Sequence, residues 1–337
     1  MQELDDDLES RLKDHVINMG LFRCPIEGQP PKIQPYSAYG YEKAQQYIEN
    51  QLSDLGVPFI HQPVIDEGQV FYNIIAGDLT NEPVSVLTAH YDTAYLCGGA
   101  DDNGSSVAVL LEVIRLLPAS ELPVQIVFLT LEEGNLAHLR SQELAWLKVI
   151  EQLQKNGGKL AESFSAGIGK STVTEEELTL KTLCGSKIYV QGSREKLQQV
   201  TKIVNLESVG YYSSKENSQE ETFNGLLPST GNFLAVLCDD KSFELARLVQ
   251  AIGEKSSFPL VILQKEQCAD VDLFLRADHH AFWEANIPAI TLTDTLEHRY
   301  DYYHLPLDLP GELDYQKMAQ LVRLLVELVK TLITKQE

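Results

Sequence analysis

The stretch that most constrains the fold runs from Val84 to Leu117. It opens with a short apolar run that ends abruptly in the polar residues His90, Tyr91 and Asp92. A glycine-rich turn and an Asp-Asp-Asn-Gly cluster follow, and then apolar residues return at helical spacing. We interpret this pattern as a buried strand, a loop and a helix. Ligands of open α/β sheets bind outside the carboxyl ends of the strands, so the polar groups of this loop are candidate site residues. The alternative is an ordinary loop whose Asp and Asn residues cap the helix.

Apolar, β-branched runs alternate with amphipathic segments along most of the chain. This alternation predicts a mostly parallel, mixed central sheet with helices on both faces, formed by one α/β domain over residues 1–337. Besides the run that begins at Val84, the expected strands are 59–65, 70–75, 124–131, 202–206, 233–238, 260–263 and 288–292. The expected helices are 4–19, 39–55, 107–117, 186–200, 242–252, 281–285 and 313–333.

Composition excludes several classes of partner. The formal net charge is -22, from 49 acidic and 27 basic residues, which argues against nucleic acid and anionic membranes because both require basic patches. No apolar run is long enough to span a bilayer. The first residues form an acidic amphipathic segment rather than a secretory signal, so we expect a cytoplasmic protein if residue 1 is the native start. The five cysteines are scattered, which argues against a disulfide framework or a thiolate zinc site.

The pattern changes over residues 135–183, which contain a Ser/Gly-rich segment and an acidic run. We expect an insertion within the domain rather than a second domain. Because it follows Glu133 directly, it should lie near the candidate site. Two interpretations stay open: a lid or subunit contact, and a surface insertion with no role. No oligomeric state is predicted.

Three apolar runs each end in histidine or carboxylates: His90 with Asp92, Glu132 with Glu133, and Glu207. Two further regions add four polar groups, namely Asp101, Asp102, His304 and Asp308. Parallel neighbours bring such strand ends to one edge, where several carboxylates would repel one another and raise their pKa values. A divalent metal ion, or two, would relieve that repulsion. Histidine and carboxylate without thiolate form a hydrolytic zinc environment.

Five short motifs occur in a fixed order: HYD, GADDN, EE, NLESVGYY and YHLPLD. This series resembles the co-catalytic zinc aminopeptidase family, whose relatives include glutaminyl cyclases and glutamate carboxypeptidases. The segment ADHHAFWEANIPAITLTDT is also similar to the family's segment before its last histidine. The resemblance extends from about Ala38 to the C-terminus. It implies a zinc-exopeptidase fold of the phosphorylase/hydrolase-like type.

The resemblance also implies two zinc ions per chain and a set of ligands. His90 and Glu207 would bind one zinc ion, and Glu133 and His304 the other. Asp101 would bridge both ions. Many family members have Asp where this chain has Glu207, which we interpret as a variant oxygen ligand.

Two further residues take roles by the same resemblance. Asp92 would hydrogen-bond the second ring nitrogen of His90 and so fix its tautomer. Glu132 would be the general base that takes a proton from metal-activated water. The family also has a cis peptide after its bridging Asp, here between Asp101 and Asp102. Its Gly-Ser element, which usually follows the two glutamates closely, corresponds to residues 185–186, beyond the insertion.

The implied activity is hydrolysis of the N-terminal peptide bond of peptides that have a free N-terminus. One alternative is a glutaminyl-peptide cyclotransferase of the same fold, and another is an inactive relative that binds a partner. The intact Asp101-Asp102-Asn103 loop and both histidines favour the peptidase. A carboxypeptidase would need a basic cluster for the substrate's carboxylate, and few basic residues lie near the motifs.

Overall fold

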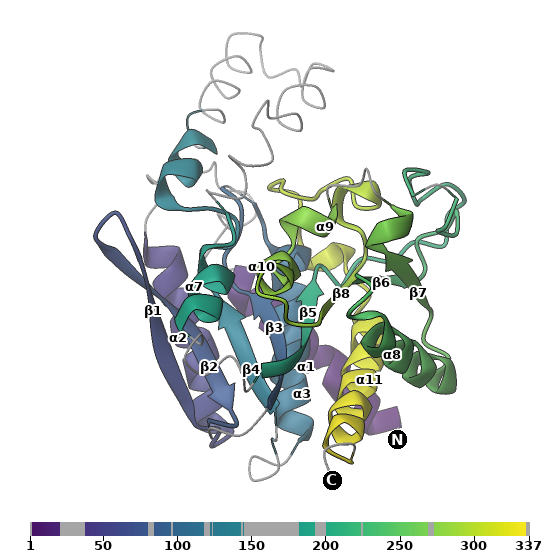
Figure 1. Cartoon of the computed structure of the whole chain (residues 1–337), viewed down its shortest axis with the longest axis horizontal. Coiled ribbons are helices and arrows are strands. Elements are labelled where there is room, and N and C mark those ends of the chain that lie inside the picture. The colour runs from purple at the N-terminus through teal and green to yellow at the C-terminus, as the bar shows by residue number, and fades with distance from the viewer. Residues whose placement is uncertain are drawn as a thin grey trace.

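The computed structural model describes residues 2–20, 38–79, 84–95, 97–117, 122, 124–142, 144, 182–192, 200–223, 225–268 and 273–334. One eight-stranded sheet with the order β1-β2-β4-β3-β5-β8-β6-β7 forms its centre (Figure 1). The strands are β1 (Phe59–Asp66), β2 (Gln69–Gly77), β3 (Val84–His90), β4 (Val124–Leu129), β5 (Val200–Glu207), β6 (Leu234–Cys238), β7 (Leu260–Gln264) and β8 (Ala289–Thr293).

The four central strands β4, β3, β5 and β8 run parallel, while β2 and β6 flank them in the antiparallel direction. Strand β3 is buried along its whole length, as expected for a strand covered on both faces. After β3 the chain moves to β4 on one side, and β5 lies on the other side. The carboxyl ends of the four strands therefore meet at one edge, at the reversal of strand order where α/β sheets bind ligands.

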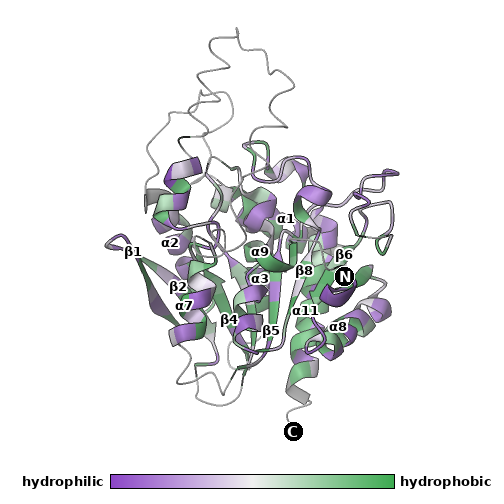
Figure 2. Cartoon of the chain, turned by 45° about the horizontal axis from the view of Figure 1, so that its top comes forward, coloured by the Kyte–Doolittle hydropathy of each residue, from purple (hydrophilic) through white to green (hydrophobic). Residues whose placement is uncertain are grey.

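Helices cover both faces of the sheet (Figure 1). One face packs on α1 (Gln2–Gly20), α2 (Ala38–Asp54), α3 (Ser106–Leu116), α8 (Phe243–Ser256) and α11 (Tyr315–Thr334). The other face packs on α7 (Cys184–Gly192), α9 (Leu273–Arg276) and α10 (His279–Glu284). The strands in the middle of the sheet are predominantly hydrophobic, whereas α7 and α8 carry hydrophilic residues on part of their surface (Figure 2). Among the described residues, no helix combines the length and apolar character needed to cross a bilayer.

The predicted class, a single α/β domain with a mixed sheet, is confirmed. The prediction of one element was wrong in part: Val200 was expected to end a helix but begins β5. There it pairs with Val84 of β3, in a position that suits a β-branched residue. Most of the expected 135–183 insertion lies outside the described residues, so its role stays a prediction. Within it, residues 136–142 are helical.

A buried ionic cluster joins α1 to α3. Glu112 of α3 is fully buried, and its carboxylate pairs with Arg11 at 2.9 Å, His15 at 3.0 Å and Arg115 at 3.0 Å. Burial alone would raise the pKa of Glu112, but hydrogen bonds from His15 and Arg11 lower it below its usual value. The cluster thus holds the N-terminal helix against the helix that follows the candidate site loop.

We expect Glu112→Gln to lower the free energy of unfolding by about 3 kcal/mol, because it removes one charge of a buried cluster. The exposed Glu42→Gln on α2 is the matched control and should change stability by less than about 0.5 kcal/mol. The folded-state pKa of Glu112 is depressed, so its contribution is present above the usual value of 4.5 and is lost as the pH falls through the lower folded-state pKa. Urea titrations should therefore show the wild-type and Gln curves converging on acidification. A constant difference would contradict this.

Candidate metal centre

The predicted site residues gather at the carboxyl edge of the four parallel strands. His90 is the last residue of β3 and Glu207 the last residue of β5, and the parallel register places them side by side. Glu133 follows β4 by a short turn, and His304 comes from the loop after β8. Sequence segments that are far apart thus meet because parallel strands end at a common edge.

Asp102 lies between the two histidines, with one carboxylate oxygen toward each. Its Oδ1 is 3.4 Å from Nε2 of His90, and its Oδ2 is 3.0 Å from Nε2 of His304. Nε2 of His90 is also 3.0 Å from Oε1 of Glu207, and Nε2 of His304 is 3.0 Å from Oε2 of Glu133. By their shortest contacts the five side chains form two histidine–glutamate pairs that share one aspartate, and Oε1 of Glu133 also lies 3.7 Å from Nε2 of His90.

The shared position belongs to Asp102 and not to the predicted Asp101. The carboxylate of Asp101 points away from both histidines: its Oδ1 accepts a 2.8 Å hydrogen bond from the backbone N–H of Gly210. Burial and the nearby Asp294 raise the pKa of Asp101 well above its usual value. The cis peptide is likewise one residue later than expected, between Asp102 and Asn103. The two neighbouring side chains diverge because the backbone at Asp102 leaves helical geometry (φ -100°, ψ 95°).

Hydrogen bonds tie this turn, η1 (Ala100–Ser105), to the end of β5 and to the residues that follow it. The side chain of Asn103 donates to the carbonyl of Leu206 at 3.0 Å and accepts from the N–H of Ser208 at 3.0 Å. The hydroxyl of Ser105 accepts from the N–H of Val209 at 2.9 Å. Both polar ends of the buried Asn103 amide are thereby satisfied, which fixes the turn relative to Glu207.

Asp92 lies beside His90, as expected, but the closer contact is through its backbone. Nδ1 of His90 is 3.1 Å from the carbonyl oxygen of Asp92 and 3.4 Å from its carboxylate Oδ1. The other oxygen, Oδ2, accepts a 2.9 Å hydrogen bond from the N–H of Glu133. With a carbonyl acceptor at Nδ1, the proton of neutral His90 resides there and Nε2 is left free to bind a cation.

Glu132 is oriented by the start of α7. Its Oε1 accepts from the N–H of Ser186 at 2.5 Å, and its Oε2 accepts from the Ser186 hydroxyl at 2.8 Å. Gly185 permits this approach, because a Cβ there would lie 2.3 Å from the Thr130 carbonyl and 2.7 Å from Oε1 of Glu132. The Gly-Ser element noted in the sequence thus holds Glu132. Burial, with repulsion from Asp92, raises the pKa of Glu132 to about 7.

Neighbouring residues of the Asp278-His279-His280 segment lie in different surroundings. Asp278 lies beside Glu132, and burial together with the charge of Glu132 raises its pKa well above the usual value. His279 is fully buried and its Nδ1 lies 2.6 Å from the hydroxyl of Thr291, while burial lowers its pKa to about 3. His279 is therefore a neutral core residue.

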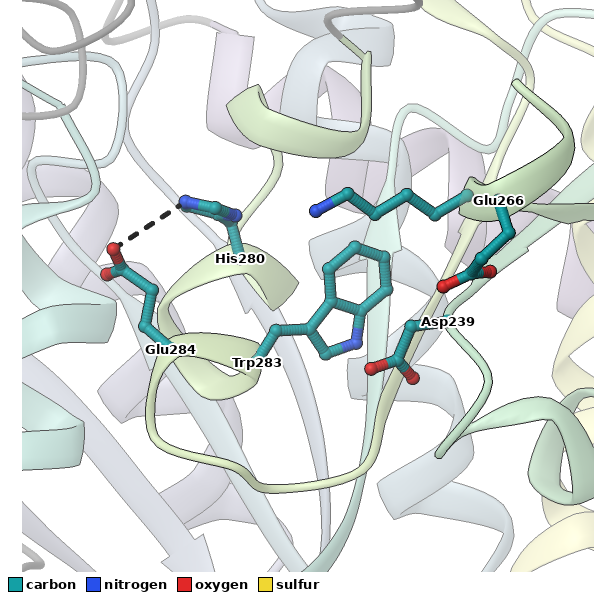
Figure 3. Close-up of a pocket in the computed structure, with 6 residues that line it drawn as sticks. Asp239, Glu266, His280, Trp283 and Glu284 are labelled. Atoms are coloured by element: carbon teal, nitrogen blue, oxygen red, sulfur yellow. Dashed lines mark ion pairs between the residues drawn. The ribbon is translucent and has the colours of Figure 1, made fainter. Parts of the chain in front are cut away.

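A pocket of about 510 Å³ beside α10 contains none of the predicted site residues (Figure 3). The indole of Trp283 forms one wall, and its N–H donates to the carbonyl of Ala289 at the start of β8. The amine of Lys265 lies 5.4 Å from the ring centroid. The lining residues are Asp239, Lys265, Glu266, His280, Trp283 and Glu284. The pocket is thus separate from the histidine–carboxylate cluster.

The cluster has the features of a cation site. One ligand atom each from His90, Asp102 and Glu133 lies within 4.8 Å of the others. Both carboxylate oxygens of Asp102 and Nε2 of His304 are buried and have no well-oriented hydrogen bond within the described residues. Imidazole nitrogen and carboxylate oxygen without sulfur are donors that zinc accepts. The residues therefore fit zinc.

The electrostatics show how strongly these groups depend on opposite charge. Burial alone would lower the pKa values of both histidines, yet Glu207 raises that of His90 and Glu133 raises that of His304 well above the usual range. Burial raises the pKa values of Glu133 and Glu207, although the histidines oppose this. Burial alone would raise the pKa of Asp102, but the nearby imidazoles of His304 and His90 lower it below its usual value. A bound divalent cation would replace the histidine protons in this role.

Comparison with known proteins agrees with this geometry. The profile of peptidase family M28 matches residues 73–329, which is more than half of the chain. The chain belongs to peptidase family M28. A relative in this comparison is the uncharacterized protein YfbL of Escherichia coli strain K12, 29% identical over 307 residues that cover 86% of this chain and 81% of YfbL.

Solved structures with the M28-like fold include a peptidase and a cyclase. The LapA aminopeptidase of Legionella pneumophila superposes with a TM-score of 0.60 at 17% identity, covering 96% of this chain and 73% of LapA. A glutaminyl cyclase of Porphyromonas gingivalis gives 0.59 at 16% identity, covering 96% of this chain and 98% of the cyclase. At these identities the likeness shows the fold, and the chemistry has to come from the site residues.

The position of Asp102 generates a direct test of the site. We expect Asp102→Asn to lower the zinc content of the purified protein sharply, because it removes the carboxylate shared by both histidines. Asp101→Asn is the neighbouring control and should retain zinc, since that side chain points toward Gly210. Elemental analysis after dialysis provides the measurement. Zinc loss in the Asp101 variant with retention in the Asp102 variant would reverse the assignment.

Proposed function

We propose that this M28 protein is a zinc-dependent aminopeptidase that hydrolyses the N-terminal peptide bond of peptides. Two zinc ions would be held by His90 with Glu207 and by His304 with Glu133, and Asp102 would be their common ligand. The observation that carries the proposal is Glu132, an oriented carboxylate that adjoins a ligand residue and is itself bonded to Ser186. Such a group is suited to proton transfer rather than to metal binding.

The balance of charge supports a substrate with a free amine. Four carboxylates, those of Asp92, Asp102, Glu133 and Glu207, lie in the cluster or in contact with it, and a fifth, that of Glu132, is close enough to Asp92 to repel it electrostatically. Two divalent ions would bring four positive charges, fewer than the five negative ones. The remaining negative charge favours an ammonium group over the terminal carboxylate that a carboxypeptidase substrate would present.

The chain's own residues define the proton path. When bound, zinc polarises the scissile carbonyl and acidifies water. Glu132 takes the proton of the attacking water at one carboxylate oxygen and passes it to the departing amine. Ser186 keeps the carboxylate in one orientation through this transfer, since its N–H and hydroxyl contact different oxygens. The pKa of Glu132, raised by burial, would be lowered by nearby cations, which leaves it ionised and ready to accept a proton at neutral pH.

A second candidate is glutaminyl-peptide cyclotransfer, in which the substrate's own amine replaces water as the nucleophile. This chain covers 98% of the length of the cyclase with a similar fold, compared with 73% of LapA. The same cluster of histidines and carboxylates could hold the substrate for either reaction. The reaction product distinguishes the two activities, because cyclisation releases ammonia and hydrolysis releases a free amino acid.

The base assignment is tested with Glu132→Gln. We expect kcat for aminoacyl anilide hydrolysis to fall by about 10²–10⁴-fold, because the amide cannot accept the proton. Zinc content should equal that of the wild type, since Glu132 bonds to Ser186 and not to the histidines. Full activity in this variant would exclude Glu132 as the base. Retained zinc in a wild type that converts only N-terminal glutaminyl peptides would identify the cyclase.

The amine requirement is tested by blocking the substrate. An N-acetylated aminoacyl anilide keeps the scissile bond but loses the positive charge, so we expect no measurable hydrolysis. The free substrate with the same side chain is the matched control. Equal rates for both would show that the enzyme is not an aminopeptidase.

A further inference from the structure

The loop that carries His304 is hydrogen-bonded to the turn that carries Asp102. The backbone N–H of Gly98, ahead of the turn, donates to the carbonyl of Leu305 at 3.2 Å. Farther along, the N–H of Ala100 approaches the backbone carbonyl of Asp308 at 3.4 Å. Two loops that each supply a candidate ligand are therefore joined at both ends of their contact.

The strongest part of this contact is the side chain of Asp308. Its Oδ1 accepts from the N–H of Asp101 at 2.8 Å, and its Oδ2 accepts from the N–H of Asp102 at 3.1 Å. Asp308 is fully buried, and the Cys97 thiol lies 3.8 Å from its Oδ2. One carboxylate thus holds two consecutive peptide groups, and it does so four residues after His304.

We propose that Asp308 is a positioning residue that sets the separation between the carboxylate of Asp102 and the imidazole of His304. This inference rests on the metal site of the proposed function and not on the reaction catalysed there. A carboxylate suits the task because its two oxygens accept two N–H groups at once. An amide in the same place offers one acceptor and turns an NH₂ group toward the other N–H.

Close backbone packing supports the same role. A Cβ on Gly98 would lie 1.9 Å from the carbonyl oxygen of Asp308, so the loops approach more closely than any other residue at position 98 would allow. Within the part of the chain that the structure describes, Asp308 forms no hydrogen bond or ion pair with either histidine and acts instead through the peptide groups of the turn. Its effect on a metal ion would therefore be through ligand placement.

The test is zinc affinity of Asp308→Asn, measured by competition with a chromophoric chelator. We expect affinity to fall by about 10–100-fold, the range typical of groups that orient metal ligands. The visible spectrum of the cobalt-loaded protein should change as well, because the ligand geometry is altered. Glu112→Gln is the matched control: it perturbs another fully buried carboxylate, lowers stability and should leave affinity and spectrum unchanged. Wild-type affinity and spectrum in the Asn variant would overturn the proposal.

A second variant, Gly98→Ala, perturbs the same contact without changing charge. The added methyl group must push the two loops apart, so zinc affinity should fall in the same direction. If Asp308→Asn does not fold, Gly98→Ala decides the question, and unchanged affinity there would overturn the proposal. A wild type that binds zinc but cleaves no peptide would refute the aminopeptidase alone. A wild type that binds no zinc would refute both.

Discussion

Asp102 is held with one carboxylate oxygen toward each of two imidazoles, and the rest of the centre depends on that division. The surrounding Glu133 and Glu207 are carboxylates removed from water, a state that is costly unless opposite charge is close. Protons on the two histidines can supply this positive charge, and so can metal ions. Either would have to lie in the small volume between the imidazoles and the carboxylates. The backbone around Asp102 is accordingly fixed on two sides, by the end of β5 with the residues after it and by the His304 loop.

Much of this arrangement follows from sequence because it follows from strand ends. Apolar β-branched runs predict buried strands, and parallel strands bring their last residues to one edge, so the sequence alone predicts that His90, Glu207 and Glu133 lie together. The choice between Asp101 and Asp102 could not be made that way. It depends on two backbone angles in a non-helical turn, and tertiary hydrogen bonds from Asn103 set the course of that turn.

Other features were beyond sequence reasoning for a related reason. The interaction of His15 with Glu112 joins residues 97 positions apart, and neither periodicity nor motif links them. The role of Asp308 is similar, since its carboxylate contacts backbone N–H groups, which every residue but proline possesses. When a side chain contacts a peptide group, the residue type of the partner does not indicate that the contact exists. The network that supports the candidate ligands is therefore less visible in sequence than the ligands themselves.

The surroundings of Glu132 include both described ends of the segment in which an insertion is predicted. The chain leaves the sheet after Glu133, and where it returns, the N–H groups of Leu183 and Cys184 donate to the carbonyls of Glu132 and Leu131 at 3.0 and 3.1 Å. The returning segment then places Ser186 on the Glu132 carboxylate. These bonds and the contact with Ser186 together hold Glu132 at the point where the two ends of the intervening segment meet.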